Sequence, residues 1–248
     1  MSAWSTKRPT VTLWRCSSIA TDASHGGVHI CVKLIVARRH VLWIGGSPAA
    51  GKSTIARMLA RDHGLTLYDF DGHEPVHVER RMTDMSLYPA YTSFRALTLD
   101  QRWLLRPADE MAAQVIAMWT ERFRLVVDDV RALPVTSPVV VEGPGLFPDC
   151  VQPVIDDANQ AIWLVPTPAF CRTVRLERDA GAFVDTSNPV QALDHVIERD
   201  NMLAAYVKRR AVALGLTVVE VDGTTPLDEM AAMVEQHFVA GARCLRER

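Results

Sequence analysis

The sequence has few cysteines and lacks a long apolar segment. Its five cysteines are widely spaced and form no Cys-x-x-Cys pair, which excludes the usual zinc sites and a disulfide framework. No run approaches the roughly 18 apolar residues that a membrane helix needs. Arg15 interrupts the weak apolar stretch that follows Lys7 and Arg8, so we expect no signal peptide. These absences predict a cytoplasmic protein with reduced thiols and no membrane partner. The cysteines are Cys16, Cys31, Cys150, Cys171 and Cys244.

The chain also lacks an excess of basic residues. It carries 27 Lys and Arg against 29 Asp and Glu, a formal net charge of −2. Proteins that bind the nucleic-acid backbone usually show a basic face or tail. Arg243, Arg246 and Arg248 come nearest to such a tail, and a solvated chain end explains them. We therefore expect no nucleic-acid partner.

A chain of 248 residues is long enough for one large α/β domain or two small ones, and it needs no disulfide or metal for stability. Residues 1–39 have no clear period and are rich in Ser, Thr and basic residues, which predicts a disordered N-terminal extension. Within this extension, only the stretch Val28–Val36 is apolar enough to pack against the rest of the protein. We predict that the folded domain spans residues 40–248.

From residue 40 onward, short apolar runs alternate with helical patterns, as in a parallel sheet built from βαβ units. The predicted strands are Val41–Gly45, Thr66–Phe70, Val139–Glu142, Ala161–Val165 and Thr217–Val221. The predicted helices are Lys52–Asp62, Ala108–Ala132, Pro168–Arg178, Val190–Leu214 and Leu227–Val239.

A glycine-rich loop follows the first predicted strand and contains the pattern Gly-x-x-x-x-Gly-Lys-Ser. Glycines let backbone N–H groups curl around a phosphate, and the next helix directs its positive end at the anion. Lys52 is expected to reach the β- and γ-phosphates of a nucleotide, and the Ser53 hydroxyl to bind Mg²⁺. The predicted phosphate-contacting residues are Gly46, Ser47, Ala49, Ala50, Gly51, Lys52, Ser53 and Thr54.

The order of motifs over residues 40–240 resembles the small P-loop kinases, a group with nucleoside monophosphate, shikimate and gluconate kinases and, nearby, chloramphenicol phosphotransferase. The resemblance implies a P-loop NTPase three-layer fold, with a five-stranded parallel sheet and helices on both faces. It implies ATP and Mg²⁺ as cofactors, an acceptor-binding segment at about 72–137 and a lid at about 168–188.

Two aspartates end the second predicted strand. Asp69 and Asp71 are two residues apart, so we expect both side chains on the same side of the sheet edge where α/β proteins bind ligands. By resemblance, Asp69 helps to hold the metal's water shell, and Asp71 acts as the base toward the acceptor hydroxyl. Alternatively, both form the turn before Gly72, and His73 is a further candidate.

Glu142 ends the third predicted strand, where the resemblance suggests a Walker-B carboxylate that contacts Mg²⁺ directly or through water. Otherwise it caps the next element. The turn Gly143-Pro144-Gly145 resembles the Asp-Gly turn of nucleotide kinases but lacks their Phe-Pro-Arg, which counts against nucleotide-monophosphate recognition.

The predicted lid begins with arginines spaced along one helical face. Arg172 and Arg175 are three residues apart and hence neighbours; Arg178 continues the face, and Arg199 lies on the next helix. By resemblance, one of these arginines neutralises the transferring phosphoryl group, and we assign Arg172 and Arg175 as catalytic. The alternative is a solvated basic face.

Two further segments are placed by resemblance alone. Asp222 and Gly223, after the last predicted strand, are expected to contact adenine, or else they form a simple turn. The segment 72–137 contains cations and aromatic residues suited to an acidic or ring-bearing acceptor, none of which is assigned to it individually. They are Arg80, Arg81, Tyr88, Tyr91, Arg95, Arg102, Trp103 and Arg106.

Together these features favour an ATP-dependent kinase that acts on a hydroxyl of a small molecule, as a monomer or homodimer. The main alternative is a P-loop regulator or slow ATPase without an acceptor. The absence of an Asn-Lys-x-Asp motif disfavours a GTPase. The slight excess of acidic residues disfavours a third alternative, a nuclease or nucleic-acid helper protein with a P-loop.

Overall fold

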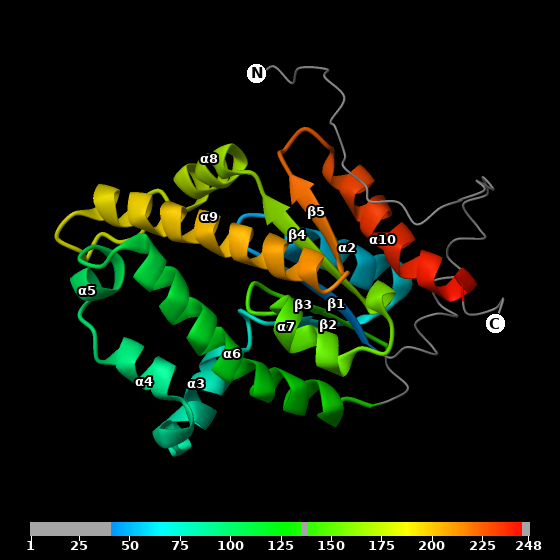
Figure 1. Ribbon diagram of the computed structural model, residues 1–248, viewed down its shortest axis with the longest axis horizontal. Coiled ribbons are helices and arrows are strands. Elements are labelled where there is room, and N and C mark those ends of the chain that lie inside the picture. The colour runs from blue at the N-terminus through cyan, green and yellow to red at the C-terminus, as the bar shows by residue number, and fades with distance from the viewer. Residues whose placement is uncertain (1–40, 135–137, 245–248) are drawn as a thin grey trace.

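A parallel sheet organises the part of the chain that the structure describes, residues 41–134 and 138–244. In the computed structural model, the described part contains one five-stranded sheet in the order β2-β3-β1-β4-β5 (Figure 1). All four strand pairs are parallel, which confirms the predicted fold class. The predicted extension, residues 1–39, lies outside the described residues. The strands are β1 (Val41–Gly46), β2 (Thr66–Asp69), β3 (Val139–Glu142), β4 (Ala161–Pro166) and β5 (Thr217–Val221).

The central strands are buried on both faces because helices cover the two sides of the sheet. Leu42 and Ile44 pack with α2 (Lys52–His63) and α10 (Leu227–Cys244) on one face. The intervening Trp43 packs on the other face with α6 (Ala108–Ala132) and α9 (Pro189–Ala213). Burial on both faces explains why β1, β3 and β4 are almost continuously apolar.

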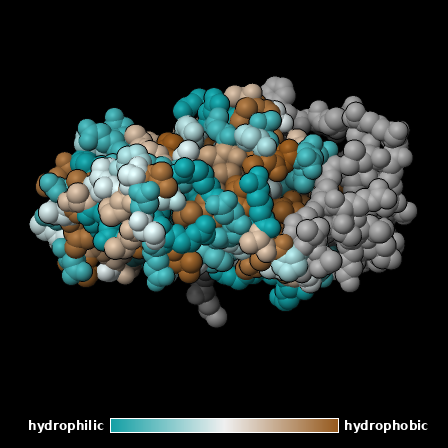
Figure 2. Space-filling view, turned by 90° about the horizontal axis from the view of Figure 1, so that it is seen from below, coloured by the Kyte–Doolittle hydropathy of each residue, from teal (hydrophilic) through white to brown (hydrophobic). Residues whose placement is uncertain are grey.

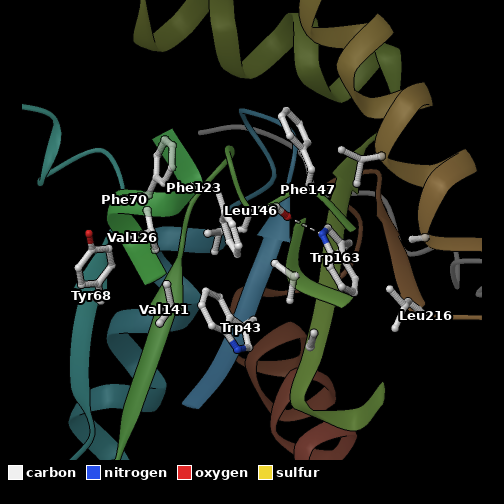
Figure 3. Close-up of a cluster of buried hydrophobic side chains, with 14 of the residues drawn as sticks. Trp43, Tyr68, Phe70, Phe123, Val126, Val141, Leu146, Phe147, Trp163 and Leu216 are labelled. Carbon is white, nitrogen blue, oxygen red and sulfur yellow. Dashed lines mark hydrogen bonds between the residues drawn. The ribbon is translucent and has the colours of Figure 1, made fainter. Parts of the chain in front are cut away.

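The second face contains the larger aromatic core (Figure 3). Trp163 of β4 is fully buried, and its indole N–H donates to the carbonyl of Leu146 at 2.7 Å. This bond satisfies the one polar atom of the side chain, as burial of tryptophan requires. It also fixes the turn after β3, which borders the predicted phosphate site.

The long helices agree closely with the sequence prediction, whereas short helices of the acceptor segment were not predicted individually. Each short helix has ten residues or fewer, so its apolar pattern has at most about three turns in which to repeat. The remaining helices are α3 (Glu74–Thr83), α4 (Pro89–Arg95), α5 (Leu99–Trp103), α7 (Pro148–Val151) and α8 (Pro168–Arg178). Single 3₁₀ turns occur at Met85–Leu87, Gln152–Val154 and Ala158–Gln160.

Figure 2 shows the molecule from below relative to Figure 1. On this face, hydrophilic and hydrophobic residues are mixed. No helix in the described ranges combines the length and the apolarity that crossing a bilayer would require.

Candidate active site

The loop between β1 and α2 has a tightly curled backbone. Gly46, Ala49 and Gly51 all have positive φ, at 134°, 66° and 77°. A Cβ atom on Gly46 would lie 1.8 Å from the carbonyl oxygen of Leu164, so only glycine fits there. Ala49 adopts a conformation that residues with a Cβ disfavour, which marks a loop held in a defined shape. The curled loop, with α2 starting directly after it, suits an anion.

Lys52 is folded back into this loop. Its ammonium donates to the carbonyl of Ser47 at 2.6 Å, and the residue is 6% exposed. Burial lowers the pKa of Lys52 to about 8, while the charges of Glu142, Asp71 and Asp200 act to raise it. The buried Ser47 hydroxyl has no hydrogen-bond partner among the described residues. The loop therefore holds a desolvated cation beside a free polar group.

Glu142 is the last residue of β3, and it is in register with Ile44 of β1 on one side and Asp69 of β2 on the other. It is 2% exposed, and burial raises the pKa of its carboxyl to about 7. A hydrogen bond with the Ser53 hydroxyl acts in the opposite direction. Its Oε2 atom has no partner within the described part of the chain. Proteins usually supply only a few of the ligands of Mg²⁺. A buried carboxylate with one free oxygen, next to a serine hydroxyl, fits this pattern.

The described residues contain no cluster of three or more His, Cys, Asp or Glu side chains that would hold a metal on its own. Mg²⁺ commonly takes one or two carboxylates together with phosphate oxygens. The pair Ser53 and Glu142 matches that pattern, so a nucleotide would have to complete the coordination.

The two predicted aspartates have different surroundings. Asp69 Oδ1 accepts from the Gly72 backbone N–H at 3.0 Å, which is the turn-forming role considered as its alternative. Asp71 remains accessible to solvent, yet desolvation by the protein around it raises the pKa of its carboxyl, while the charges of Lys52 and Arg122 act to lower it. Asp71 is thus the freer of the two aspartates, and its charge acts on Lys52.

Arg122 of α6 is a site residue that sequence reasoning missed. It is 2% exposed, its guanidinium carbon lies 3.8 Å from the centroid of the Phe70 ring, and it donates to the Phe70 carbonyl. It also forms an ion pair with Glu74. A signal was present, because Arg122 interrupts the apolar stripe that buries α6.

A chain of hydrogen bonds through His77 to Asp129 also fixes the side chain of Arg122. Arg122 Nε donates to His77 Nδ1 at 2.8 Å. Because an arginine only donates, His77 carries its proton on Nε2 and donates to Asp129 Oδ2 at 2.7 Å. Burial lowers the pKa of His77, which favours this neutral form. Arg122 is therefore a fixed cation behind the loop that contains Asp71.

The turn after β3 is shaped to receive Phe70. A Cβ on Gly145 would lie 2.2 Å from the tip of the Phe70 ring, and one on Gly143 would lie 2.2 Å from the Phe70 Cβ. The Gly-Pro-Gly motif is thus explained by the close approach of the ring on which Arg122 stacks. The structure gives it a packing role beside the site.

The lid arginines fall into different environments. Arg172 is exposed and pairs with Asp194 of α9 at 2.9 Å. Arg175 is buried, and its Nε donates to the fully buried Asp200 at 2.7 Å. Arg178 is exposed, and its charge acts to lower the pKa of Lys52. Arg178 is therefore within electrostatic range of the loop lysine, and so is Asp200, which pairs with Arg175 in an internal ion cluster.

Arg199 completes that cluster, because its Nη2 donates to Asp200 Oδ1 at 2.7 Å. Sequence reasoning named Arg175 and Arg199 but missed Asp200, the anion between them. Asp200 follows the buried Val196 and Ile197 and precedes Leu203 in the apolar stripe of α9, which was the available signal.

The predicted adenine loop forms a capped turn beside α8. Asp222 Oδ1 accepts from the Thr224 N–H at 2.9 Å and from its hydroxyl at 2.7 Å, and these bonds lower the pKa of Asp222. Gly223 lies against the ring of Phe170. The Asp222 carboxylate is thus engaged in the turn, and only backbone groups of this loop remain to contact an adenine base.

Most arginines of the acceptor segment are engaged within the protein. Arg80 pairs with Asp129, and Arg81 pairs with Glu74 while stacking 3.7 Å from the centroid of Tyr91. Arg102 and Arg106 donate to backbone carbonyls. The exposed Arg95 contacts the Tyr91 hydroxyl at 3.4 Å.

No family model and no curated protein matches the sequence. Several solved structures are similar to this chain. An uncharacterized protein from Eubacterium ventriosum has 12% identity and a TM-score of 0.45, over 82% of this chain and 99% of that one. TT1252 from Thermus thermophilus has 20% identity and a TM-score of 0.44, over 84% and 97%. Shikimate kinase from Bacteroides thetaiotaomicron has 15% identity and a TM-score of 0.36, over 84% and 98%. Similarity at this level assigns no activity to the chain.

Proposed function

We propose that this chain is an ATP-dependent kinase that phosphorylates a hydroxyl group of a small molecule. The observation that carries the proposal is the convergence of charges on Lys52, at the start of α2. The charges of Glu142 at the end of β3, of Asp71 in the loop after β2 and of the buried Asp200 act to raise the pKa of its ammonium. The charge of Arg178, at the end of α8, acts to lower it. A phosphate loop alone would serve any nucleotide-binding protein, whereas carboxylates and an arginine within electrostatic range of the loop lysine are groups that phosphoryl transfer uses.

In this proposal the loop amides and Lys52 hold the β- and γ-phosphates. Ser53 and Glu142 would bind Mg²⁺, which when present neutralises phosphate charge and orients the oxygens. The free Glu142 oxygen and the Ser47 hydroxyl without a partner support this, because buried polar atoms usually have partners. A bound metal–nucleotide complex would supply them.

The transfer itself assigns one role to each remaining side chain. The acceptor oxygen bonds to the γ-phosphorus, and the bond from phosphorus to the β,γ-bridging oxygen breaks, so ADP leaves with the electron pair. Asp71 takes the hydroxyl proton, and Arg178 offsets the charge on the transferring group. The raised pKa of Asp71 supports this role, because it makes the carboxylate a stronger base than an ordinary aspartate.

Asp71→Asn tests the proposal, because it keeps the size of the side chain and removes its basicity. ATP consumption would be measured against a library of hydroxylated metabolites and antibiotics, with hydrolysis in the absence of acceptor as the baseline. We expect acceptor-dependent turnover in the parent and a decrease of about 10²-fold in the variant. ATP affinity, measured by calorimetry, should remain because Lys52 and the loop amides hold the phosphates.

A P-loop regulator or slow ATPase is the second candidate. It is favoured by the internal pairing of Arg80 and Arg81, which leaves fewer cations for an anionic acceptor. Hydrolysis that no acceptor stimulates and that Asp71→Asn leaves unchanged would support this candidate. Lys52→Ala should weaken ATP binding in either case, and unchanged affinity and turnover would refute the phosphate site itself.

A further inference from the structure

Trp103 connects the acceptor segment to the lid. Its ring centroid lies 5.7 Å from that of Phe94 of α4, at 74°, and 5.6 Å from that of Phe183 in the loop after α8, at 59°. The guanidinium carbon of Arg199 lies 5.7 Å from the same indole. Figure 1 shows α5, which ends at Trp103, beside the start of α9. The protein itself therefore engages an indole that the sequence suggested for stacking on an acceptor.

A hydrogen bond attaches the same loop to α5 a second time. The backbone N–H of Ser187 donates to Asp100 Oδ1 at 2.8 Å, and this bond lowers the pKa of Asp100. Phe183 and Ser187 therefore tie both ends of a short segment to one helix of five residues. Two separate contacts restrict the loop more than either contact alone.

Phe183 itself has a strained backbone. Its φ is 67°, in the left-handed region that residues with a Cβ disfavour. Its carbonyl accepts from the Thr186 N–H at 2.9 Å and from the Thr186 hydroxyl at 2.7 Å. A strained residue persists where its surroundings hold it. Here those surroundings are the Thr186 bonds and the ring contact with Trp103.

The aromatic contact leads by packed neighbours to α8. Arg199, which faces the indole, shares Asp200 with Arg175 of α8. Asp200 is fully buried, so this cluster fixes α8 against α9. Arg178 is the last residue of α8 and directly precedes the loop that contains Phe183, and its charge acts to lower the pKa of Lys52.

We propose that Trp103 and Phe183 form an aromatic latch. They are positioning residues that hold the lid loop, residues 179–188, on the acceptor segment and thereby hold Arg178, the residue directly before this loop, in place for the proposed transfer. The expected effect on turnover rests on the proposed kinase function, whereas the contact between Trp103 and Phe183 does not depend on it.

Limited proteolysis of the full chain tests the contact without an acceptor. Trypsin would cleave after the exposed Arg178 when the adjoining loop opens, and mass spectrometry would identify that cut. We expect Phe183→Ala and Trp103→Ala to speed this cleavage about tenfold, because each removes the aromatic pair. Phe183→Tyr should restore the parental rate. Val184→Ala is the matched control, because Val184 is the next residue and is 67% exposed.

Phe183→Gly separates the ring from the backbone. Glycine relieves the strain at positive φ but removes the latch, so we expect cleavage at least as fast as in Phe183→Ala. Slower cleavage than in the parent would show that the backbone alone holds the loop. If Trp103→Ala does not fold, the Phe183 variants carry the test.

Turnover provides the second measurement. We expect Phe183→Ala to lower kcat and to leave KM for ATP nearly unchanged, with recovery in Phe183→Tyr. Parental cleavage in Phe183→Ala, or equal effects of Phe183→Ala and Val184→Ala, would overturn the latch. Faster cleavage with parental kcat would overturn its positioning role. A parent without acceptor-dependent turnover would instead refute the kinase function and, with it, that role.

Discussion

The arginines of α8 show how a neighbouring carboxylate determines what a cation can do. Arg175 is held by the buried Asp200 and by Asp179, so its charge is neutralised inside the protein. Arg172 pairs on the surface with Asp194, an exposed interaction that contributes little to stability. Arg178 pairs only with the adjacent Asp179 among the described residues and influences Lys52. A transferring phosphoryl group would therefore be neutralised best by Arg178.

We predict that Arg178→Ala lowers turnover about tenfold or more while ATP affinity changes little, because charge in the transition state is what the side chain would offset. Arg172→Ala is the control on the same helix and should remain close to the parent. Steady-state kinetics and calorimetry measure the two effects. A larger loss of turnover in Arg172→Ala than in Arg178→Ala would assign the neutralisation of the phosphoryl group to Arg172, as the sequence suggested.

Glu142 leads to a prediction about pH. Its folded-state pKa, raised from 4.5 to about 7, means that the folded protein holds a proton between these values that the unfolded chain has released. Its contribution to stability is therefore complete below pH 4.5 and is lost as the pH rises through 7. Glu142→Gln removes this dependence.

We expect Glu142→Gln to gain stability relative to the parent by about 2 kcal/mol more at pH 7.5 than at pH 5. Urea titrations at the two pH values measure the difference. Glu177→Gln makes the same change at an exposed position of α8 and should show no such trend. The same difference in both variants would mean that burial of Glu142 is not its cause.

At the scale of elements, helix α3 is anchored by a partly exposed carboxylate on two buried cations. Glu74 pairs with Arg81 and Arg122, whose side chains are 1% and 2% exposed, against 42% for Glu74. Buried guanidinium groups are costly without a counter-charge. Glu74 thus joins the start of α3 to α6 directly after the loop that contains Asp71.

Glu74→Ala should lower the free energy of unfolding by about 3 kcal/mol, because it leaves both arginines without their carboxylate. Urea denaturation measures the loss, and Glu79→Ala, at an exposed position of the same helix, is the control. Equal effects of the two substitutions would show that the ion triad does not hold the helix.

At the scale of the whole molecule, deletion of residues 1–35 is expected to leave the melting temperature and ATP affinity nearly unchanged. The reason is that β1 starts at Val41 and both of its edges are already paired, with β3 and β4. Thermal unfolding and calorimetry of the full and shortened chains test this. A decrease of several degrees would indicate that Val28–Val36 packs on the domain.

Most of the framework could be predicted from local patterns. The bounds of β3, β5, α6 and α8 match the prediction exactly as residue ranges, because burial on one or both faces imposes a period that the amino acids must follow. The loop before Lys52 was also recognisable from the local sequence, because its glycines meet a backbone requirement within a few residues.

The partners of the charged side chains depended on the tertiary structure. Arg122 reaches the Phe70 carbonyl across 52 residues of sequence, and Arg175 reaches Asp200 across 25. Trp103 meets Phe183 only because α5 folds against the start of α9. Periodicity records which face of an element is buried, but not which distant group it is buried against. Desolvation and pairing, which determine whether a cation is structural or free to meet a phosphate, arise only when the elements pack.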